Sequence, residues 1–193
     1  ATIVSADNTT RQRAEADSNV GGVVAVGVSS ATASSDTVTE AWLGTSVKLT
    51  GGSLSITATG DDDNYADTTS GAFGGIPVAA ATADTENTST TTAEIHDSVA
   101  GRNIDLTSRG SGEFQIVADH TAAFDSVVSA LAGGLFGGTG AEIDNTVVST
   151  VDAEVGSNVD VAARNVLMDA VNRARKNVDG EANIDGEAAG AIA

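Results

Sequence analysis

Apolar and polar residues alternate along much of the chain. In the segments "SVKLT", "NIDLTS" and "NVDVAA", two apolar residues flank a single Lys or Asp. A period of two residues places the apolar pair on one face of an extended strand and the charged residue on the other. We therefore predict half-buried strands, whose apolar pairs are Val47 with Leu49, Ile104 with Leu106, and Val159 with Val161.

Longer runs of small and β-branched residues, at residues 23–28, 76–83 and 147–155, also predict strands. Two other segments have a different period. Residues 119–138 carry apolar residues at helical spacing, and residues 165–177 are compatible with a helical turn or two ending in basic residues. The corresponding residues 61–73 lack this spacing. We therefore expect a variable excursion, helical in some repeats and looped in others.

Short anchors recur in a fixed order, which indicates an internal repeat. The first anchor is an apolar residue, a variable residue and Ala, and it begins at Val4, Ile56, Ile116 and Met168. These starts are separated by 52, 60 and 52 residues. The order of the anchors predicts about 3.5 repeats within a single unit, residues 1–193. Their approximate bounds are 1–53, 54–113, 114–165 and a partial repeat at 166–193.

Glycines supply the other two anchors. One glycine follows each triplet at a nearly constant distance, at Gly22, Gly75, Gly134 and Gly186. The third anchor, Gly-x-x-apolar-x-apolar, begins at Gly44, Gly101 and Gly156. The segment 186–193 corresponds in this alignment to the start of "GGVVAVGV", so the chain is expected to begin and end inside a repeat.

The composition favours thin stacked layers over a globular core. Aromatic residues make up 3% of the chain, which has 22 Gly, so the core must be built from small and β-branched side chains. We predict a mainly β solenoid, in its simplest form a parallel β-helix. A repeat of this length exceeds one ordinary rung, so each repeat is expected to hold two or more rungs, or one rung with an excursion. The predicted inner layer comprises Val47, Leu49, Ile56, Ile104, Leu106, Ile116, Val159 and Val161.

Charge and composition limit the classes of partner. There are 27 acidic and 9 basic residues, for a formal net charge of -18, and such a field repels phosphate backbones and anionic membranes. We therefore predict no nucleic-acid partner and no membrane insertion. The absence of Cys excludes disulfides and thiolate metal sites. The expected partners are copies of the chain, or further repeats of a longer chain, stacked end to end.

The strongest candidate for cation binding is the group Asp61, Asp62 and Asp63, because Ca²⁺ prefers several hard oxygen ligands. The group matches no EF-hand and no calcium-binding nonapeptide, and corresponding segments do not repeat it. A solvated turn is the favoured interpretation. We predict no metal or cofactor, and Ca²⁺ binding is kept as an alternative.

No local signature of catalysis occurs in the sequence, so no catalytic residue is predicted and the chain is not expected to be an enzyme. His96 and His120 have no second His or Cys close by in the sequence, and we expect them at the surface or at a rung edge. The basic group Arg173, Arg175 and Lys176 is expected on a helix C-terminal face, or against an acidic neighbouring copy. A calcium-dependent surface-layer or binding module and a carbohydrate-active enzyme remain as alternatives.

The anchors "GTSVKL", "GRNIDL" and "GSNVDV" are each followed by a second strand and an Ala/Thr/Asp-rich stretch. This pattern resembles the repeats of filamentous haemagglutinin-like bacterial adhesins. The resemblance implies a parallel β-helix shaft, secreted or held at the cell surface, that spans distance and self-associates. No site motif of that family is matched, so no functional residue is carried over. The expected function is that of a structural extracellular repeat segment of a bacterial adhesin or self-assembling surface filament.

Overall fold

The computed structural model describes residues 1–193 except 45–46, 99–101, 109–110, 178–182 and 191–193. The described residues are mainly β and contain no helix. Six strands form one sheet in which every pairing is parallel, and two short strands form a second sheet. The strands of the large sheet are β1 (Thr2–Leu43), β2 (Leu54–Ile95), β4 (Glu113–Gly134), β5 (Gly138–Val155), β7 (Asn165–Lys176) and β8 (Ile184–Gly190).

The expected helical excursions are therefore wrong. Residues 119–134 lie in β4, whose every residue from Phe114 to Gly134 pairs with β2, and residues 165–176 lie in β7. The apolar residues in 119–138 are at helical spacing because buried and exposed positions do not alternate strictly in β4. Ala122 and Ala123 are both buried, and so are Asp125 and Ser126. The parallel ladder to β2 satisfies the backbone along this stretch without a helix.

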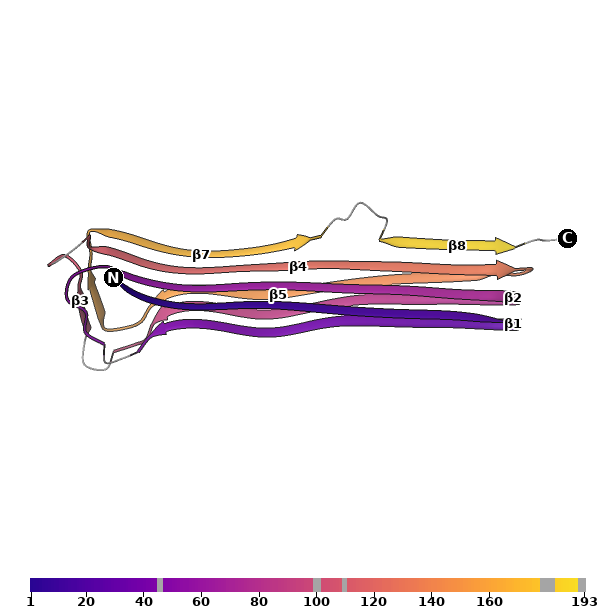
Figure 1. Cartoon of the computed structure of the whole chain (residues 1–193), viewed down its shortest axis with the longest axis horizontal. Coiled ribbons are helices and arrows are strands. Elements are labelled where there is room, and N and C mark those ends of the chain that lie inside the picture. Colours follow the sequence, from indigo (N-terminus) through magenta and orange to yellow (C-terminus); the bar gives the residue numbers. More distant parts are fainter. Residues whose placement is uncertain (45–46, 99–101, 109–110, 178–182, 191–193) are drawn as a thin grey trace.

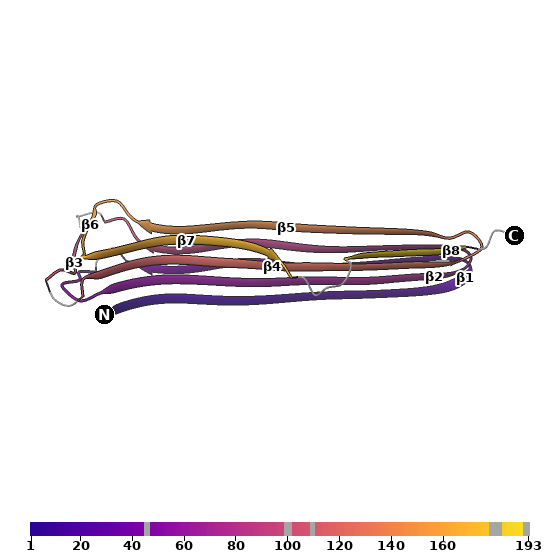
Figure 2. The same ribbon diagram turned by 90° about the horizontal axis from the view of Figure 1, so that it is seen from above.

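β1 and β2 each consist of two legs that run in opposite directions. In Figure 1 the indigo half of β1 runs the length of the molecule, turns at the end labelled β1, and returns as its purple half. We call these the outward leg (residues 2–22 of β1 and 54–74 of β2) and the return leg (residues 24–43 and 76–95). β4 is the outward leg of the next circuit and β5 its return leg, while β7 and β8 continue the outward series (Figure 2).

The register of the outward legs matches the first sequence anchor. Val4 pairs with Ile56, Ile56 with Ile116, and Ile116 with Met168. The four triplets therefore stack directly on one another at the spacing that the sequence indicates. This confirms the first anchor as a structural register.

The other two anchors need correction. The glycines that pair at the turn are Gly22, Gly74, Gly134 and Gly190, whereas Gly186 pairs with Ala130. The sequence match was one residue off at Gly75 and four residues off at Gly186, because glycine is common in both places. Residues 191–193, which belong to the segment aligned with "GGVVAVGV", lie outside the described residues.

The third anchor is displaced by two residues. In the small sheet, β3 (Arg102–Asp105) pairs with β6 (Val159–Ala162) so that Ile104 lies opposite Val161 and not Val159. A shift of two keeps the same side chains facing inward, which explains why the sequence alignment looked consistent. Gly101, the glycine of this anchor in the second repeat, lies outside the described residues.

Glycine at the turn is required by close approach of neighbouring circuits. A Cβ built on Gly74 would overlap the carbonyl oxygen of Gly22, and one on Gly134 would overlap the carbonyl oxygen of Gly74. Backbone atoms cannot rotate away, so a side chain here would force the circuits apart. The turn glycines therefore form a column that allows the stack to close at this end.

The core lies between the outward and return legs and changes character along them. Near the connecting segments it is apolar, with Ile56, Ile95 and Ile116 each 0% exposed. Toward the glycine turn it consists mainly of alanine, for example Ala66 and Ala79. Between the two apolar clusters lies a band of polar side chains.

Most of the predicted inner layer is confirmed. Ile56, Ile104, Leu106 and Ile116 are buried, and Leu49, Val159 and Val161 are partly buried against the same cluster. Val47 is the exception. It is 37% exposed because it lies in the segment before the isolated bridge at Thr50, outside the regular strands.

Candidate functional site

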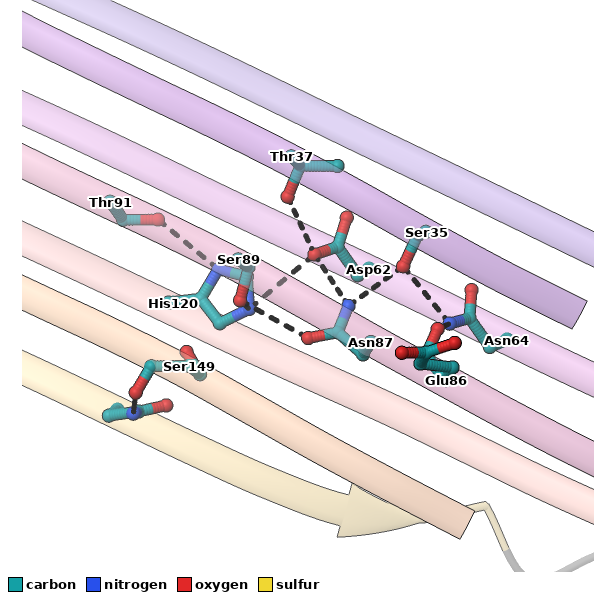
Figure 3. A network of polar contacts seen from close by, with 11 residues as sticks. Ser35, Thr37, Asp62, Asn64, Glu86, Asn87, Ser89, Thr91, His120 and Ser149 are labelled. Carbon is teal, nitrogen blue, oxygen red and sulfur yellow. Dashed lines mark hydrogen bonds and ion pairs between the residues drawn. The ribbon is translucent and has the colours of Figure 1, made fainter. Parts of the chain in front are cut away.

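The band of polar side chains between the two legs is the candidate site (Figure 3). We call it the buried polar network, and it includes side chains from both legs of β2. The alternation of the strand determines which residues belong to the network. Asp62 and Asn64 face inward because they lie an even number of residues after the inward-facing Ile56 and Ala58. His120 of β4 continues the inward positions of Ile116 and Ala118 in the same way. The members on the return legs are Ser35, Thr37, Asn87, Ser89 and Thr91.

His120 and Asp62 are the two fully enclosed titratable groups of the network. His120 is 1% exposed, and its ring contacts two hydroxyls: Nε2 lies 2.8 Å from Ser89 Oγ and Nδ1 lies 3.2 Å from Thr91 Oγ1. Its β2 register partner is Gly60, and a Cβ at Gly60 would lie 2.5 Å from His120 Nδ1. The missing side chain of Gly60 therefore makes the space that the imidazole occupies.

The hydrogen bonds around His120 determine its tautomer. The Ser89 hydroxyl donates to Asn87 Oδ1 at 3.1 Å, so its oxygen is left to accept from the imidazole. Nε2 therefore carries the proton and donates to Ser89, while Nδ1 accepts from Thr91. The imidazole is neutral in this arrangement. Burial is the largest effect on the His120 pKa and lowers it, while the nearby carboxylates of Asp62, Asp61 and Asp119 act in the opposite direction.

The remaining hydrogen bonds run toward Asp62 and Ser35. Asn87 Nδ2 donates to Asp62 Oδ2 and to Ser35 Oγ, both at 2.8 Å, and Thr37 Oγ1 donates to Asp62 Oδ2 at 3.0 Å. Asn64 Nδ2 donates to Ser35 Oγ at 3.0 Å and to the Glu86 carbonyl at 2.7 Å. The network thus joins both legs of β2 to the return leg of β1 and to β4, and two donors, Thr37 and Asn87, hold the buried Asp62 carboxylate.

Ser89, His120 and Asp62 include the three residue types of a hydrolytic triad, but their geometry differs from one. In a triad the carboxylate holds Nδ1 while Nε2 faces the serine. Here Asp62 Oδ2 lies 3.6 Å from Nε2, the same nitrogen that contacts Ser89, and Nδ1 contacts Thr91. All three residues are at most 3% exposed, so a substrate has no access to the serine. The arrangement joins strands and does not present a nucleophile.

The network corrects the predictions of a solvated aspartate turn and of a surface position for His120. Asp61, Asp62 and Asp63 do not form a turn: they lie within the outward leg of β2 and pair with Thr9, Thr10 and Arg11. Asp62 faces inward, and one of its oxygens, Oδ1, has no hydrogen-bond partner among the described residues. The described residues contain no group of three or more His, Cys, Asp or Glu side chains arranged to hold a metal ion.

The expectation of a surface position is also wrong for His120, which lies in the core. That expectation rests on the absence of a second His or Cys nearby, which speaks against a metal site but does not indicate whether the side chain is buried. The signal that could have found it is the alternation from Phe114 through Ile116 and Ala118, which places His120 on the buried face.

His96 directly follows β2 and its side chain is partly exposed, as expected. Its ring stacks on Trp42, with centroids 4.7 Å apart and planes 9° from parallel, and its Nε2 lies 2.6 Å from Glu94 Oε1. Trp42 is 49% exposed, so the pair covers the outer face of the return legs. The contact joins two circuits, because Trp42 belongs to β1 and His96 follows β2.

The basic group near the end lies on strand β7 and not on a helix, because β7 pairs with β4 along its whole length. Arg173 forms an ion pair with Asp119 of β4, and both side chains are substantially exposed. Lys176 donates a hydrogen bond to Asn183. These contacts are internal to the chain.

Comparison with known proteins adds no relationship. No family model matches the chain, no curated protein matches it, and no solved structure matches it. Within the described residues, no helix has the length and apolar character needed to cross a membrane.

Proposed function

We propose that the chain is a β-solenoid of the parallel β-helix type, built from about 3.5 repeats of 52–60 residues, and that it serves as a structural extracellular segment of a bacterial adhesin or surface filament. The observation that carries the proposal is the continuous parallel ladder. It runs from β1 through β2 and β4 to β7 and β8, with the same residue positions in register in successive circuits.

The use of the polar groups supports a structural role. Several inward polar side chains join strands that are far apart in the sequence, as in the Asn87 bond to Ser35 and the Thr85 bond to Asn145. Such bonds fix the register of one circuit on the next, and buried unmatched polar groups would penalise any slip. A rod held in register in this way is suited to span distance.

The exposed strand edges support continuation of the stack. Among the described residues, β1 pairs with a strand along one edge only, and an unpaired edge is a template for another strand. We infer that further circuits, from additional repeats or from other copies, extend the ladder beyond this segment. The surplus of acidic residues keeps such a rod soluble and limits lateral association.

Imaging of the native material tests the proposal. An antibody against the chain, carried on gold particles, is applied to intact cells that produce it and viewed by electron microscopy, with antibody absorbed on purified chain as the control. We expect label along thin fibres outside the cell. Label confined to the cell interior, or to dispersed particles in the medium, would contradict the proposal.

A further inference from the structure

The chain is free of charge around the glycine turn of each of its first three circuits. Residues 18–35, 68–83 and 126–141 contain no Asp, Glu, Lys, Arg or His, and each of these segments spans a turn. The turns lie together at the end of the molecule marked by the labels β1 and β2 (Figure 1). The acidic strand β8 pairs with the outward leg β4, so the uncharged surface is on the side of the return legs.

Apolar side chains cover the outer face of the return legs next to these turns. Alternation places the side chains of β1 and β2 at even-numbered positions of the return legs outward. Phe136 continues this pattern, because its amide donates to the Gly75 carbonyl at 3.2 Å, as a register partner of Ile76 would. We call this set of exposed residues the turn-side face: Val24, Val26, Val28, Ile76, Val78 and Phe136.

Exposure of the turn-side face does not depend on where a circuit lies in the stack. Ile76 and Val78 belong to β2, which pairs with β1 on one edge and, from Val78 onward, with β5 on the other. They are nevertheless 50% and 44% exposed, because their side chains point away from the core and across the stacking direction. Six half-exposed side chains of this size leave roughly 600 Å² of apolar surface in water, the upper end of what single soluble proteins expose.

Beyond the turn-side face, the charges of the return legs are all negative. Every charged residue in the ranges 24–43, 76–95 and 138–155 is Asp or Glu, and each lies at an outward-facing position. The nearest is Glu142, which pairs with Thr82, four residues along β2 from Val78. Two copies that packed along whole return legs would bring carboxylates against carboxylates, which is destabilising. The charge pattern therefore allows contact only near the turns.

We propose that the turn-side face binds a second copy of the chain through the same face, with the legs of the two copies pointing in opposite directions. In this arrangement only the turn ends overlap, and the acidic rows of each copy extend away from the other. The two copies are related by a two-fold axis parallel to the stacking direction. The inference goes beyond the proposed function, because it concerns contact between rods side by side and requires no end-to-end stacking.

A two-fold axis through the row of Val78 matches large side chains with small ones. The row before Val78 holds Ile76 and Phe136, and the row after it holds Ala80 and Gly140. The axis exchanges these rows, so Phe136 of one copy lies over Gly140 of the other. A Cβ built on Gly140 meets nothing within 4 Å, so this position offers open space for the ring. Two such faces bury roughly 1,200 Å², the lower end for stable interfaces, so the dimer should dissociate on dilution.

Sedimentation equilibrium of the full chain at several concentrations tests the dimer. Added salt should favour it, because salt screens the repulsion between the acidic bodies and leaves the apolar contact intact. Val78→Asp should weaken dimerisation about tenfold or more, because it would bury a carboxylate at the axis. Val148→Asp is the matched control, an outward valine of β5 that is 56% exposed among the acidic rows, and it should change dimerisation by less than about twofold. Circular dichroism verifies folding, and Val26→Asp, in the same row, serves if Val78→Asp does not fold.

Single cysteines locate the axis, because the natural chain has none. Val78→Cys places one thiol of each copy beside the axis, so a short bismaleimide should join two copies there and should not join Val148→Cys. A spin label on Thr146→Cys lies opposite Glu86, about 26 Å along the leg from the row of Val78. Pulsed electron paramagnetic resonance should therefore give about 50 Å between the two labels, whereas legs that run in the same direction would give less than about 25 Å.

Several results would overturn the inference. These are a chain that stays monomeric at every concentration and salt, equal effects of the Val78 and Val148 variants, or the short label distance. Binding of a monomer to neutral phosphatidylcholine vesicles, lost in Val78→Asp, would also overturn it and would assign the face to a lipid surface. The proposed function fails separately: end-to-end stacking gives particles larger than a dimer that persist in Val78→Asp, and the absence of labelled fibres would leave the dimer intact.

Discussion

Gly60→Ala is expected to damage the buried polar network from its centre. The added Cβ would lie 2.5 Å from His120 Nδ1, 2.8 Å from Thr91 Oγ1 and 3.3 Å from His120 Cε1, whereas ordinary contacts begin at 3.4 Å. The imidazole must therefore move by about 1 Å in a close-packed core. Its bonds of 3.2 Å to Thr91 and 2.8 Å to Ser89 would then exceed hydrogen-bonding distance.

The magnitude follows from those two bonds. A buried polar group left without a partner costs about 1–3 kcal/mol, so two lost bonds predict a decrease of about 2–6 kcal/mol in the free energy of unfolding. For a chain of this size, that corresponds to a decrease in Tm of about 4–24 °C. Gly140→Ala is the matched control, because a Cβ there meets nothing within 4 Å. It should be neutral or stabilising by up to about 1 kcal/mol.

Urea unfolding followed by far-UV circular dichroism, with fluorescence of the single Trp42 as a second probe, measures both variants. A double-mutant cycle with His120→Ala identifies the cause. Removing the ring removes the overlap with His120 and leaves only the one with Thr91 Oγ1, so the penalty of Gly60→Ala should fall by at least about 1 kcal/mol in the His120→Ala background. An equal penalty in both backgrounds, or a penalty no larger than that of Gly140→Ala, would refute the assignment of His120 to the core.

Three further predictions concern the turn, the pH response and the core. Gly74→Ala should lower the free energy of unfolding by about 3 kcal/mol or more, because the new Cβ overlaps the carbonyl oxygen of Gly22. If Gly74→Ala and Gly140→Ala have the same stability in urea titrations, the glycine column is contradicted. Burial lowers the pKa of His120 in the folded chain, so just below pH 6.5 the unfolded chain binds more protons than the folded chain. The free energy of unfolding should therefore fall as pH falls through that value. His120→Gln should reduce this slope, and an unchanged slope would argue against a buried neutral imidazole. Ile116→Ala should cost about 2–5 kcal/mol and the outward Val117→Ala much less, and reversal of that order would show that the faces are misassigned.

Only the first residues of the outward legs could be predicted well from the sequence, because the rest of β4 and β7 was expected to be helical. Apolar residues followed by Ala recur at Val4, Ile56 and Ile116 with enough regularity to give the register that the structure shows. Period-two alternation also identified most of the inner layer. Local patterns were sufficient here because each strand stacks on the strand with the matching pattern.

The buried polar network could not be predicted in the same way. Asp62 is held by Thr37 and Asn87, each 25 residues away along the chain, so its partners depend on where the return legs begin. Inward positions are even-numbered on the outward leg of β2 and odd-numbered on its return leg, and an error of one residue at the turn would invert the second face. The sequence places the turn glycine at Gly75, one residue after Gly74, so it could not predict which residues of the outward and return legs face each other.

Disulfide formation between engineered cysteines tests the central claim, the parallel register of successive circuits, most directly. The chain has no Cys, and the outward residues Ser5, Thr57 and Val117 are consecutive register partners. Neighbouring strands lie about 4.8 Å apart, within the Cα separation that a disulfide spans, whereas a two-residue offset gives about 8 Å. We predict that Ser5→Cys with Thr57→Cys, and Thr57→Cys with Val117→Cys, cross-link rapidly under mild oxidation, and that Ser5→Cys with Thr59→Cys does not. Efficient cross-linking of the offset pair, or failure of both in-register pairs in folded protein, would contradict the stacked arrangement.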